Sequence, residues 1–395
     1  MLIDNLTFNL DTYLYLERYV NNGSPSGFTD KNTTSEMTRP FGSNKSFYLY
    51  GVSFDEIDYS FDYGKKPDGF KWDMLLHPDM IDMLPNLPKC QALEVSPTAS
   101  SRTVRVLDNE WFVKLAYKKM IGRIDRTINC CHAQSSVEVS SLIEQSIDAH
   151  ELPSTFFFLR EPFARVISYK GDVWGIIMRE AAPYPYDSSI KIQIPAFALF
   201  SKDRLHPEEE SLLVQLIRFK SPKNIEDYLL EQFLIPLYDC YFMLLIRCGL
   251  QLECHAQNCL FAFNEKMDVI GVVEKDAESI DKDIPLMESI GKGELITPMD
   301  YKCLHKTDYN YYIMHSFMFD FKLGQYLISP IIDEVSRFFP IDISYIETTI
   351  KHHNRQYIEM LPQDFFPSSW YDYANVIHDR NKPRPYVAHD NPRFR

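Results

Sequence analysis

The alternation of apolar and polar positions predicts two lobes of different make-up. Between residues 71 and 185, short apolar runs predict strands, among them 104–107, 111–115, 156–159 and 174–178, with a hairpin turn at Gly171-Asp172. A helix is predicted at 137–147. From residue 207 onward, runs with helical spacing predict a helix that begins at Pro207 and further helices near 224–248, 309–327, 331–339 and 343–360. Loops are expected at 21–46, 55–69 and 129–136, and residues 281–308 are expected on the surface. The chain is therefore predicted to be α+β, divided into 1–70, 71–185 and 186–395.

One hairpin in the second lobe is predicted to carry chemistry. The long helix should stop at Gly249, and a polar loop with Glu253, His255, Gln257 and Asn258 follows. Apolar runs at 260–263 and 269–273, joined by a polar turn, then predict a β-hairpin. Its return strand brings Asp276 back to the Asn258 end. Glu278, just after it, is either a second acid of the site or a surface charge. An amide oxygen and a carboxylate at one end are ligands for Mg²⁺ held against nucleotide phosphates.

Three interpretations of this hairpin stay open from the residues alone. A polar turn that caps the helix, with the histidine satisfied by backbone groups, needs no ligand. A kinase-like phosphotransferase uses the same metal groups, but its pattern has a catalytic Asp shortly before the Asn, and here Glu253 precedes His255. The third interpretation is a protein that binds a nucleotide but is catalytically impaired.

Several ordered motifs resemble one known family. Glu253-Cys-His255-Ala-Gln257-Asn258 is similar to the E-A-H-x-Q-N motif of the IucA/IucC family, the nonribosomal-peptide-synthetase-independent siderophore synthetases. Upstream, the matching segments are Thr98-Ala-Ser100-Ser-Arg102-Thr103 (T-x-S-x-R-T), Lys114-Leu115 (K-L), Arg126-Thr127 (R-T) and Arg179-Glu180 (R-E-x-P). The last segment is interpreted as an Arg–Glu pair that holds a corner of the fold, with a catalytic role as the alternative. From chemistry alone, hydroxyls, backbone N–H groups and an Arg fork suit phosphate oxygens, although a Ser/Thr-rich turn before a strand is the plainer interpretation of 96–103.

The resemblance implies a hand-like, distantly kinase-like enzyme. It would be an AMP-forming ligase that adenylates citrate or a related acid and joins it to an amine or alcohol. The implied cofactors are ATP and Mg²⁺. The resemblance and the hairpin together place ATP on Thr98, Ser100, Arg102, Thr103, Lys114, Arg126, His255, Gln257, Asn258 and Asp276. The metal ligands expected are Asn258, Asp276 and Glu253. Lys114, Arg126 and His255 are expected to take part in catalysis.

The sequence also departs from the family pattern. Gly122 stands where the family has Thr, which removes a hydroxyl near the substrate acid. Gly23-Ser-Pro25, with Lys31, lacks the His of the family's Gly-His-Pro motif, and Asp79-Met80 replaces Trp-Gln after His77-Pro78. Family members are longer at the N-terminus, so residues 1–70 are expected to form only a reduced version of that domain. The closing Asn391-Pro392, after Lys382 and Arg384, echoes the family's end.

Composition and charge limit the classes of partner and the compartment that are expected for this chain. The 395 residues, 45% of them hydrophobic, predict a folded chain, and the net charge of −14 argues against nucleic acid or an anionic membrane as the main partner. The eight cysteines show no paired C-x-x-C spacing, which argues against zinc and favours a reducing compartment. No signal peptide is evident, so a cytoplasmic location is expected. The sequence does not fix the oligomeric state, and a homodimer is left open.

Overall fold

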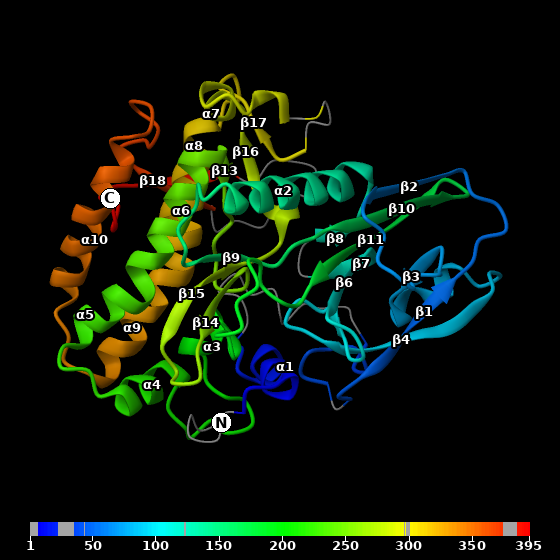
Figure 1. The fold of residues 1–395 in the computed structure, drawn as a ribbon, viewed down its shortest axis with the longest axis horizontal. Coiled ribbons are helices and arrows are strands. Elements are labelled where there is room, and N and C mark those ends of the chain that lie inside the picture. Colours follow the sequence, from blue (N-terminus) through cyan, green and yellow to red (C-terminus); the bar gives the residue numbers. More distant parts are fainter. Residues whose placement is uncertain are drawn as a thin grey trace.

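The computed structural model describes residues 7–22, 35–42, 44–121, 124–295, 297, 301–373 and 385–395. Figure 1 shows a sheet-rich lobe on the right and a helix-rich lobe on the left. The predicted α+β class is confirmed by the large antiparallel sheet of one lobe and the helices of the other. Gly23-Ser-Pro25, Lys31, Gly122, Lys382 and Arg384 lie outside the described residues.

The first lobe is built on an eight-stranded antiparallel sheet. Its strands run in the order β2 (Tyr59–Gly64), β10 (Phe163–Tyr169), β11 (Asp172–Glu180), β6 (Trp111–Leu115), β5 (Thr103–Val106), β4 (Lys89–Pro97), β1 (Phe47–Val52) and β3 (Met74–Leu76). Beside it lies a short hairpin of β7 (Tyr117–Ile121) and β8 (Ile124–Arg126). The sheet crosses the boundary predicted at residue 70, because β1 bonds to β4 and β2 to β10. The three-part division stays a prediction.

The second lobe surrounds a four-stranded sheet with helices. The sheet order is β12 (Ile192–Pro195), β14 (Cys259–Phe263), β15 (Val269–Glu274) and β9 (Phe156–Phe158), with β9 parallel to β15. Smaller sheets join β13 (Leu250–Gln251), β16 (Asp281–Asp283) and β17 (Cys303–Leu304), and pair β18 (Trp370–Tyr373) with β19 (Tyr386–His389). The helices are α3 (Ala196–Phe200), α4 (Leu212–Lys220), α5 (Ile225–Leu229), α6 (Ile235–Cys248), α7 (Ile284–Ser289), α8 (Tyr311–Ser316), α9 (Ser329–Phe338) and α10 (Ile343–Ile358). The predicted hairpin is confirmed as β14–β15.

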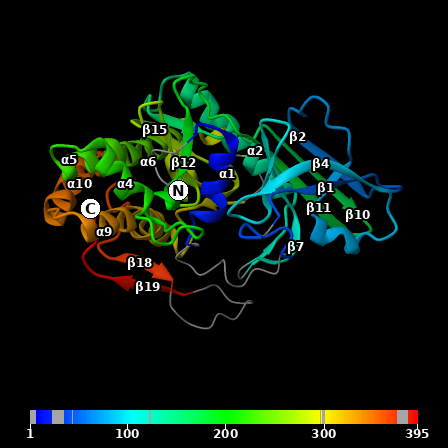
Figure 2. The same cartoon turned by 90° about the horizontal axis from the view of Figure 1, so that it is seen from below.

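Two helices connect the lobes. Figure 2 shows α1 (Leu10–Tyr19) between the helical lobe and the sheet lobe, and it contacts both β12 and β4. The other, α2 (Cys130–Asp148), lies along β10 and β11 and reaches α6 at its other end (Figure 1). Lys282 Nζ donates to Ser135 Oγ of α2 at 2.9 Å, which ties this helix to the second lobe. Segments from both lobes are thus held against one another.

The most apolar helical run belongs to the core. Among the described residues, one run, Ile225–Cys248, is long and apolar enough to cross a membrane by length and composition. It comprises α5, a π-helical segment (Leu230–Leu234) and α6, with Pro236 in the first turn of α6. Sixty-one per cent of its apolar window is buried, and it contacts β15 and α10. Packing inside the protein therefore accounts for its apolar surface.

Four local predictions are wrong. Residues 59–64 form edge strand β2 rather than a loop, since their aromatic side chains stay largely exposed and resemble loop sequence. The helix predicted from residue 137 begins at Cys130, because Asn129 caps it by accepting from His132 N at 3.1 Å. The helix predicted at Pro207 begins at Leu212. Asp281–Asp283, expected on the surface, are buried because they form strand β16 between β13 and β17.

Candidate functional site

The β14–β15 hairpin places its two polar ends together. Gly249 ends α6 in the left-handed region, at φ +66°, and its N–H donates to Leu245 O at 2.8 Å, as the sequence predicted. After β15, Asp276 also adopts a positive φ of +78°, which L residues rarely occupy without a compensating local reason. Lys275 N donates to Asn258 O at 3.0 Å, so the loop before β14 and the turn after β15 are bonded directly.

The polar loop is held by its own hydrogen bonds. Asn258 Nδ2 donates to Glu253 O and to Ser279 Oγ, both at 3.2 Å. No hydrogen bond to its amide oxygen is recorded in the described residues, and an oxygen of this type can bind a cation. His255 Nδ1 accepts from Gln257 N at 3.2 Å. Burial lowers the pKa of His255 to about 4, so the ring is neutral at pH 7. The loop therefore presents an uncharged imidazole and an amide.

The first lobe supplies cations opposite the hairpin. On β6, Lys114 pairs with Ile177 of β11, and Arg179 lies two residues further along that strand, so both side chains share one face of the sheet. Arg102 lies just before β5, where Thr103 pairs with Lys114. All three cations are buried. Neighbouring strands thus collect positive charge on one face, despite the net charge of −14.

Asp276 and Glu278 are the acids that these cations meet. Lys114 Nζ bonds to Asp276 and lies 2.6 Å from Glu278 Oε2. Arg179 donates to Asp276 Oδ1 at 2.8 Å, and Arg102 lies 3.7 Å from Glu278. Burial opposes ionisation of Asp276, but the charges of Lys114 and Arg179 hold its pKa well below the usual range. Both lobes therefore meet in a buried network of alternating charge.

Arg126 faces the same network from β8. It is half-buried, and Arg102 donates to its carbonyl oxygen at 3.2 Å. Burial first, and then the charge of Arg102, lowers the pKa of Arg126, while Asp276, Glu278 and Glu253 act in the opposite direction. The guanidinium remains charged at neutral pH, since arginine titrates far above it. The predicted Arg126, Lys114 and Asp276 thus come together, although they are distant in sequence.

The Ser/Thr-rich turn is closed by internal bonds. Thr98 Oγ1 donates to Thr103 O at 2.6 Å, and Ser100 Oγ accepts from Thr103 N at 2.9 Å. These bonds shape the turn that delivers Arg102 to the site. Thr98 and Thr103 are buried, whereas Ser100 is partly exposed and can offer its hydroxyl outward. The structure therefore gives Thr98 and Thr103 a shaping role, and their contact with phosphate stays a prediction.

Glu253 is directed elsewhere than the predicted metal position. Its carboxylate accepts from Lys322 Nζ at 2.6 Å and lies 4.0 Å from His255 Nε2. Although burial opposes ionisation, Lys322 and His255 lower the pKa of Glu253 to about 2. In the part of the chain that the structure describes, its carboxylate shares no contact with Asp276. Glu278 is the acid placed beside Asp276, and metal binding by Glu253 stays a prediction.

These groups fit magnesium and a polyphosphate by their chemistry. Asn258, Asp276 and Glu278 supply hard oxygen donors, which Mg²⁺ prefers. Arg102, Lys114, Arg126 and Arg179 supply cations that would have to face anionic phosphates. In the structure Asp276 and Glu278 pair with Arg102, Lys114 and Arg179, and two acids leave this set of four cations with excess positive charge. Groups suited to a metal and groups suited to phosphates therefore lie at one place.

One protein-family model matches part of the chain. The model of the IucA / IucC family matches residues 82–201. Over this stretch the chain is similar to the IucA / IucC family. The match includes Arg102, Lys114, Arg126 and Arg179, and it ends before the hairpin that carries Asp276. Comparison with curated proteins gives no match.

Solved structures share the fold over nearly the whole chain. The petrobactin biosynthesis protein AsbB from Bacillus anthracis str. Sterne has a TM-score of 0.73 at 13% identity, covering 97% of this chain and 75% of that one. The aerobactin synthetase IucA from a hypervirulent pathotype of Klebsiella pneumoniae has a TM-score of 0.66 at 13% identity, covering 98% and 79%. ATP-bound IucA gives 0.62 at 12% identity, covering 84% and 66%. The fold shared with these structures therefore includes the second lobe as well as the first.

Some residues of the site were not predicted from the sequence. Arg179 was expected to pair with Glu180, but neighbouring strand residues face opposite sides, and Arg179 bonds instead to Glu161 at 2.7 Å and to Asp276. Glu180 bonds to Arg160. The sequence alone leaves Glu278 open between a surface charge and a second acid of the site. Its spacing of two from Asp276 was the available signal. His132 and Tyr301, 3.5 and 3.4 Å from Glu278, had no signal in the sequence.

Proposed function

We propose that the protein is an ATP-dependent ligase of siderophore-type biosynthesis that adenylates a carboxylate of citrate or a related acid. The single observation that carries this proposal is the meeting of Lys114 and Arg179 with Asp276 across the two lobes. The match of residues 82–201 to the IucA / IucC family model and the fold shared with an ATP-bound aerobactin synthetase support it.

The proposed reaction has two steps. A carboxylate oxygen of the acid attacks the α-phosphorus of ATP, and the bond from that phosphorus to the β-phosphate bridging oxygen breaks, which releases pyrophosphate. An amine or hydroxyl then attacks the acyl carbon, loses a proton and displaces AMP, giving an amide or an ester. Arg102, Lys114 and Arg126 would hold the phosphates and oppose the charge that develops on them. Bound Mg²⁺, on Asp276 and Asn258 with Glu278 beside them, would supply further neutralisation of phosphate charge.

The alternative of a phosphotransferase is less well supported by the loop. Transfer to an alcohol needs a base near the nucleophile, normally an Asp in the histidine loop. Here the loop acid, Glu253, is bound by Lys322. An acid substrate is already ionised at neutral pH and needs no such base. The arrangement therefore favours a carboxylate as the first nucleophile.

Product analysis tests the proposal. The protein is incubated with ATP, Mg²⁺, carboxylic acids including citrate, and a panel of polyamines and amino alcohols. AMP and pyrophosphate in equal amounts are expected. ADP with a phosphorylated alcohol would establish the phosphotransferase instead. ATP binding by calorimetry without turnover on any pair would establish a catalytically impaired binding protein.

A further inference from the structure

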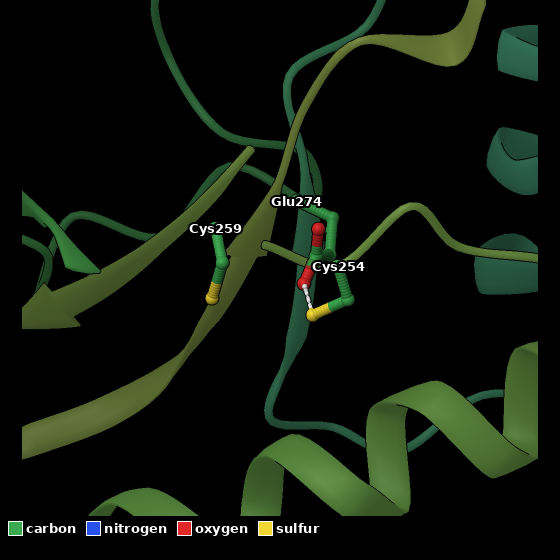
Figure 3. Close-up of side chains that lie close together, drawn as sticks. All are labelled: Cys254, Cys259 and Glu274. Atoms are coloured by element: carbon green, nitrogen blue, oxygen red, sulfur yellow. Dashed lines mark hydrogen bonds between the residues drawn. The ribbon is translucent and has the colours of Figure 1, made fainter. Parts of the chain in front are cut away.

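A second cluster of metal-ligating side chains lies beneath the catalytic loop. It consists of Cys254 from the loop, Cys259 from the first position of β14 and Glu274 from the last position of β15, and all three are buried. Figure 3 shows the thiol of Cys254 bonded to the Glu274 carboxylate, with Cys259 on the neighbouring strand. The proposed ligase chemistry uses none of the three.

The hairpin register brings the donors together. Cys259 and Glu274 are directly paired across β14 and β15, so their side chains project from the same face of the ladder. Cys254 Sγ lies 3.0 Å from Glu274 Oε1, and the three ligand atoms all lie within 4.8 Å of one another. Two thiolates on a tetrahedral zinc ion, each about 2.3 Å from it, are separated by roughly 3.8 Å. Small side-chain rotations would therefore close the cluster on one ion.

The buried carboxyl group of Glu274 has weak hydrogen-bond partners. Its side chain is 1% exposed, and its recorded hydrogen-bond partners are the thiols of Cys254 and Cys259, both weak donors. A carboxyl group buried among apolar side chains is costly unless a strong partner or a cation satisfies it. Cys254 and Cys259 belong to the main hydrophobic core together with Cys240 of α6. An ion bound by the cluster would supply the missing partner.

We propose that Cys254, Cys259 and Glu274 form a structural site for a borderline-soft divalent cation, with Zn²⁺ the expected ion. Thiolate and carboxylate donors in a closed, buried position suit zinc, whereas magnesium prefers oxygen donors only. Each ligating thiol gives up its proton to solvent when the ion binds. A tetrahedral ion takes a fourth ligand, and Cys240 is a further buried thiol of the same core, although it lies outside the group whose ligand atoms are within 4.8 Å of one another. The cysteine spacing that argued against zinc in the sequence overlooked the pairing of β14 with β15.

The site would act on the catalytic loop through the chain. Cys254 lies between Glu253 and His255, Cys259 follows Asn258, and Glu274 lies two residues before Asp276. An ion held by the three would tie the loop to the return strand and fix both ends of the hairpin. Because a bound ion favours the state that binds it, its removal should lower thermal stability. The inference is independent of the proposed function, since a phosphotransferase would have the same cluster.

Cobalt substitution tests the site without measuring activity. The full chain, purified under reducing conditions and stripped of metal, is titrated with Co²⁺ and then with Zn²⁺. One equivalent of Co²⁺ should bind with an intense thiolate-to-cobalt charge-transfer absorption that Zn²⁺ abolishes. Cys254→Ala, which introduces the alanine of the family motif, should lose the absorption and remain folded by circular dichroism. Glu274→Gln should bind Co²⁺ at least about tenfold more weakly, a ligand being lost.

Two controls make the outcome decisive. Cys90→Ser removes an exposed thiol, and Asp276→Asn alters the proposed magnesium site, so both should keep the absorption of the parent. A folded parent without any charge-transfer absorption, or an absorption that survives Cys254→Ala, would overturn the proposal. An increase of the melting temperature by Zn²⁺ in the parent and in Cys90→Ser, but not in Cys254→Ala, would add support from a second measurement.

Discussion

Lys114 Nζ lies 2.6 Å from Glu278 Oε2, joining the central sheet of one lobe to the turn after the hairpin of the other. Both side chains are less than a tenth exposed. Lys114 also bonds to Asp276, so one ammonium group stands between two acids. Without it, the buried Glu278 carboxylate and the partly exposed Asp276 carboxylate would face each other. The pair therefore stabilises the fold and also keeps the proposed metal ligands ionised.

Removing this ammonium group should cost stability. Lys114→Met leaves Glu278 buried with a weaker set of partners, and breaking a buried pair from one side costs about 3–5 kcal/mol. The matched variant Lys220→Met breaks the more exposed pair with Asp268 and should cost at most about 1 kcal/mol. Urea denaturation measures both. Adding Glu278→Gln to Lys114→Met should restore part of the loss, and a double variant less stable than the single one would contradict the explanation.

The Arg102 variant should weaken nucleotide binding. Arg102→Ala removes a charged hydrogen-bonding group worth about 1.5–3 kcal/mol, which corresponds to roughly a 10- to 150-fold rise in the dissociation constant for ATP. Calorimetry with Mg²⁺ present measures the change. Arg218→Ala removes an exposed arginine of α4 and should leave ATP affinity as in the parent. Equal affinity in Arg102→Ala and parent would take the 98–103 turn out of the site.

The dependence of turnover on Mg²⁺ should change when Asp276 is replaced. Asp276→Asn keeps a residue that tolerates the positive φ of this position, so the backbone should be preserved while a charged ligand is lost. Turnover at low Mg²⁺ should disappear and return only in part at high Mg²⁺. Asp268→Asn changes the acid at the opposite end of β15, beside Lys220, and serves as the matched control. Unchanged Mg²⁺ dependence in Asp276→Asn would place the metal elsewhere.

The pH dependence of stability should report on buried His77. Burial lowers the pKa of His77 to about 4, below the value near 6.5 of an unfolded chain. The unfolded state therefore binds more protons between these values, so stability present above pH 6.5 is lost as pH falls to 4. The loss from this group is up to about 3 kcal/mol.

Melting temperatures measured from pH 7 to pH 4.5 check this expectation. His77→Asn keeps an oxygen that can accept from Asp79 N, as the ring does at 3.2 Å, but cannot gain a proton. Its stability should fall less steeply with acid than that of the parent. His206→Asn, at an exposed histidine, should follow the parent curve. Parallel curves for His77→Asn and the parent would show that His77 does not contribute to acid sensitivity.

The sequence predicted what local pattern determines. The β14–β15 hairpin, the stop at Gly249 and the strand that carries Lys114 follow from apolar periodicity and turn chemistry within short windows. The partners of Lys114 do not follow from such a short window, because Asp276 lies 162 positions further along the chain. Arg179 was assigned to its neighbour Glu180 for the same reason. Which distant strand lies opposite is decided by sheet order, and a single sequence does not display sheet order.

The last prediction separates the ligase from a phosphotransferase by where ATP is cleaved. Adenylation of an acid is a complete half-reaction, since the carboxylate displaces pyrophosphate before any amine is needed. The loop acid Glu253 has a pKa of about 2 and is bound by Lys322, and His255 has a pKa of about 4, so neither is a strong base at pH 7. An ionised carboxylate does not need a base, whereas an alcohol does.

The acid substrate alone should therefore support exchange of labelled pyrophosphate into ATP, and Lys114→Met should abolish this exchange. Labelled ATP would be measured with each acid of the panel in the absence of amines. No exchange with any acid, together with ADP formed from an alcohol, would overturn the ligase assignment.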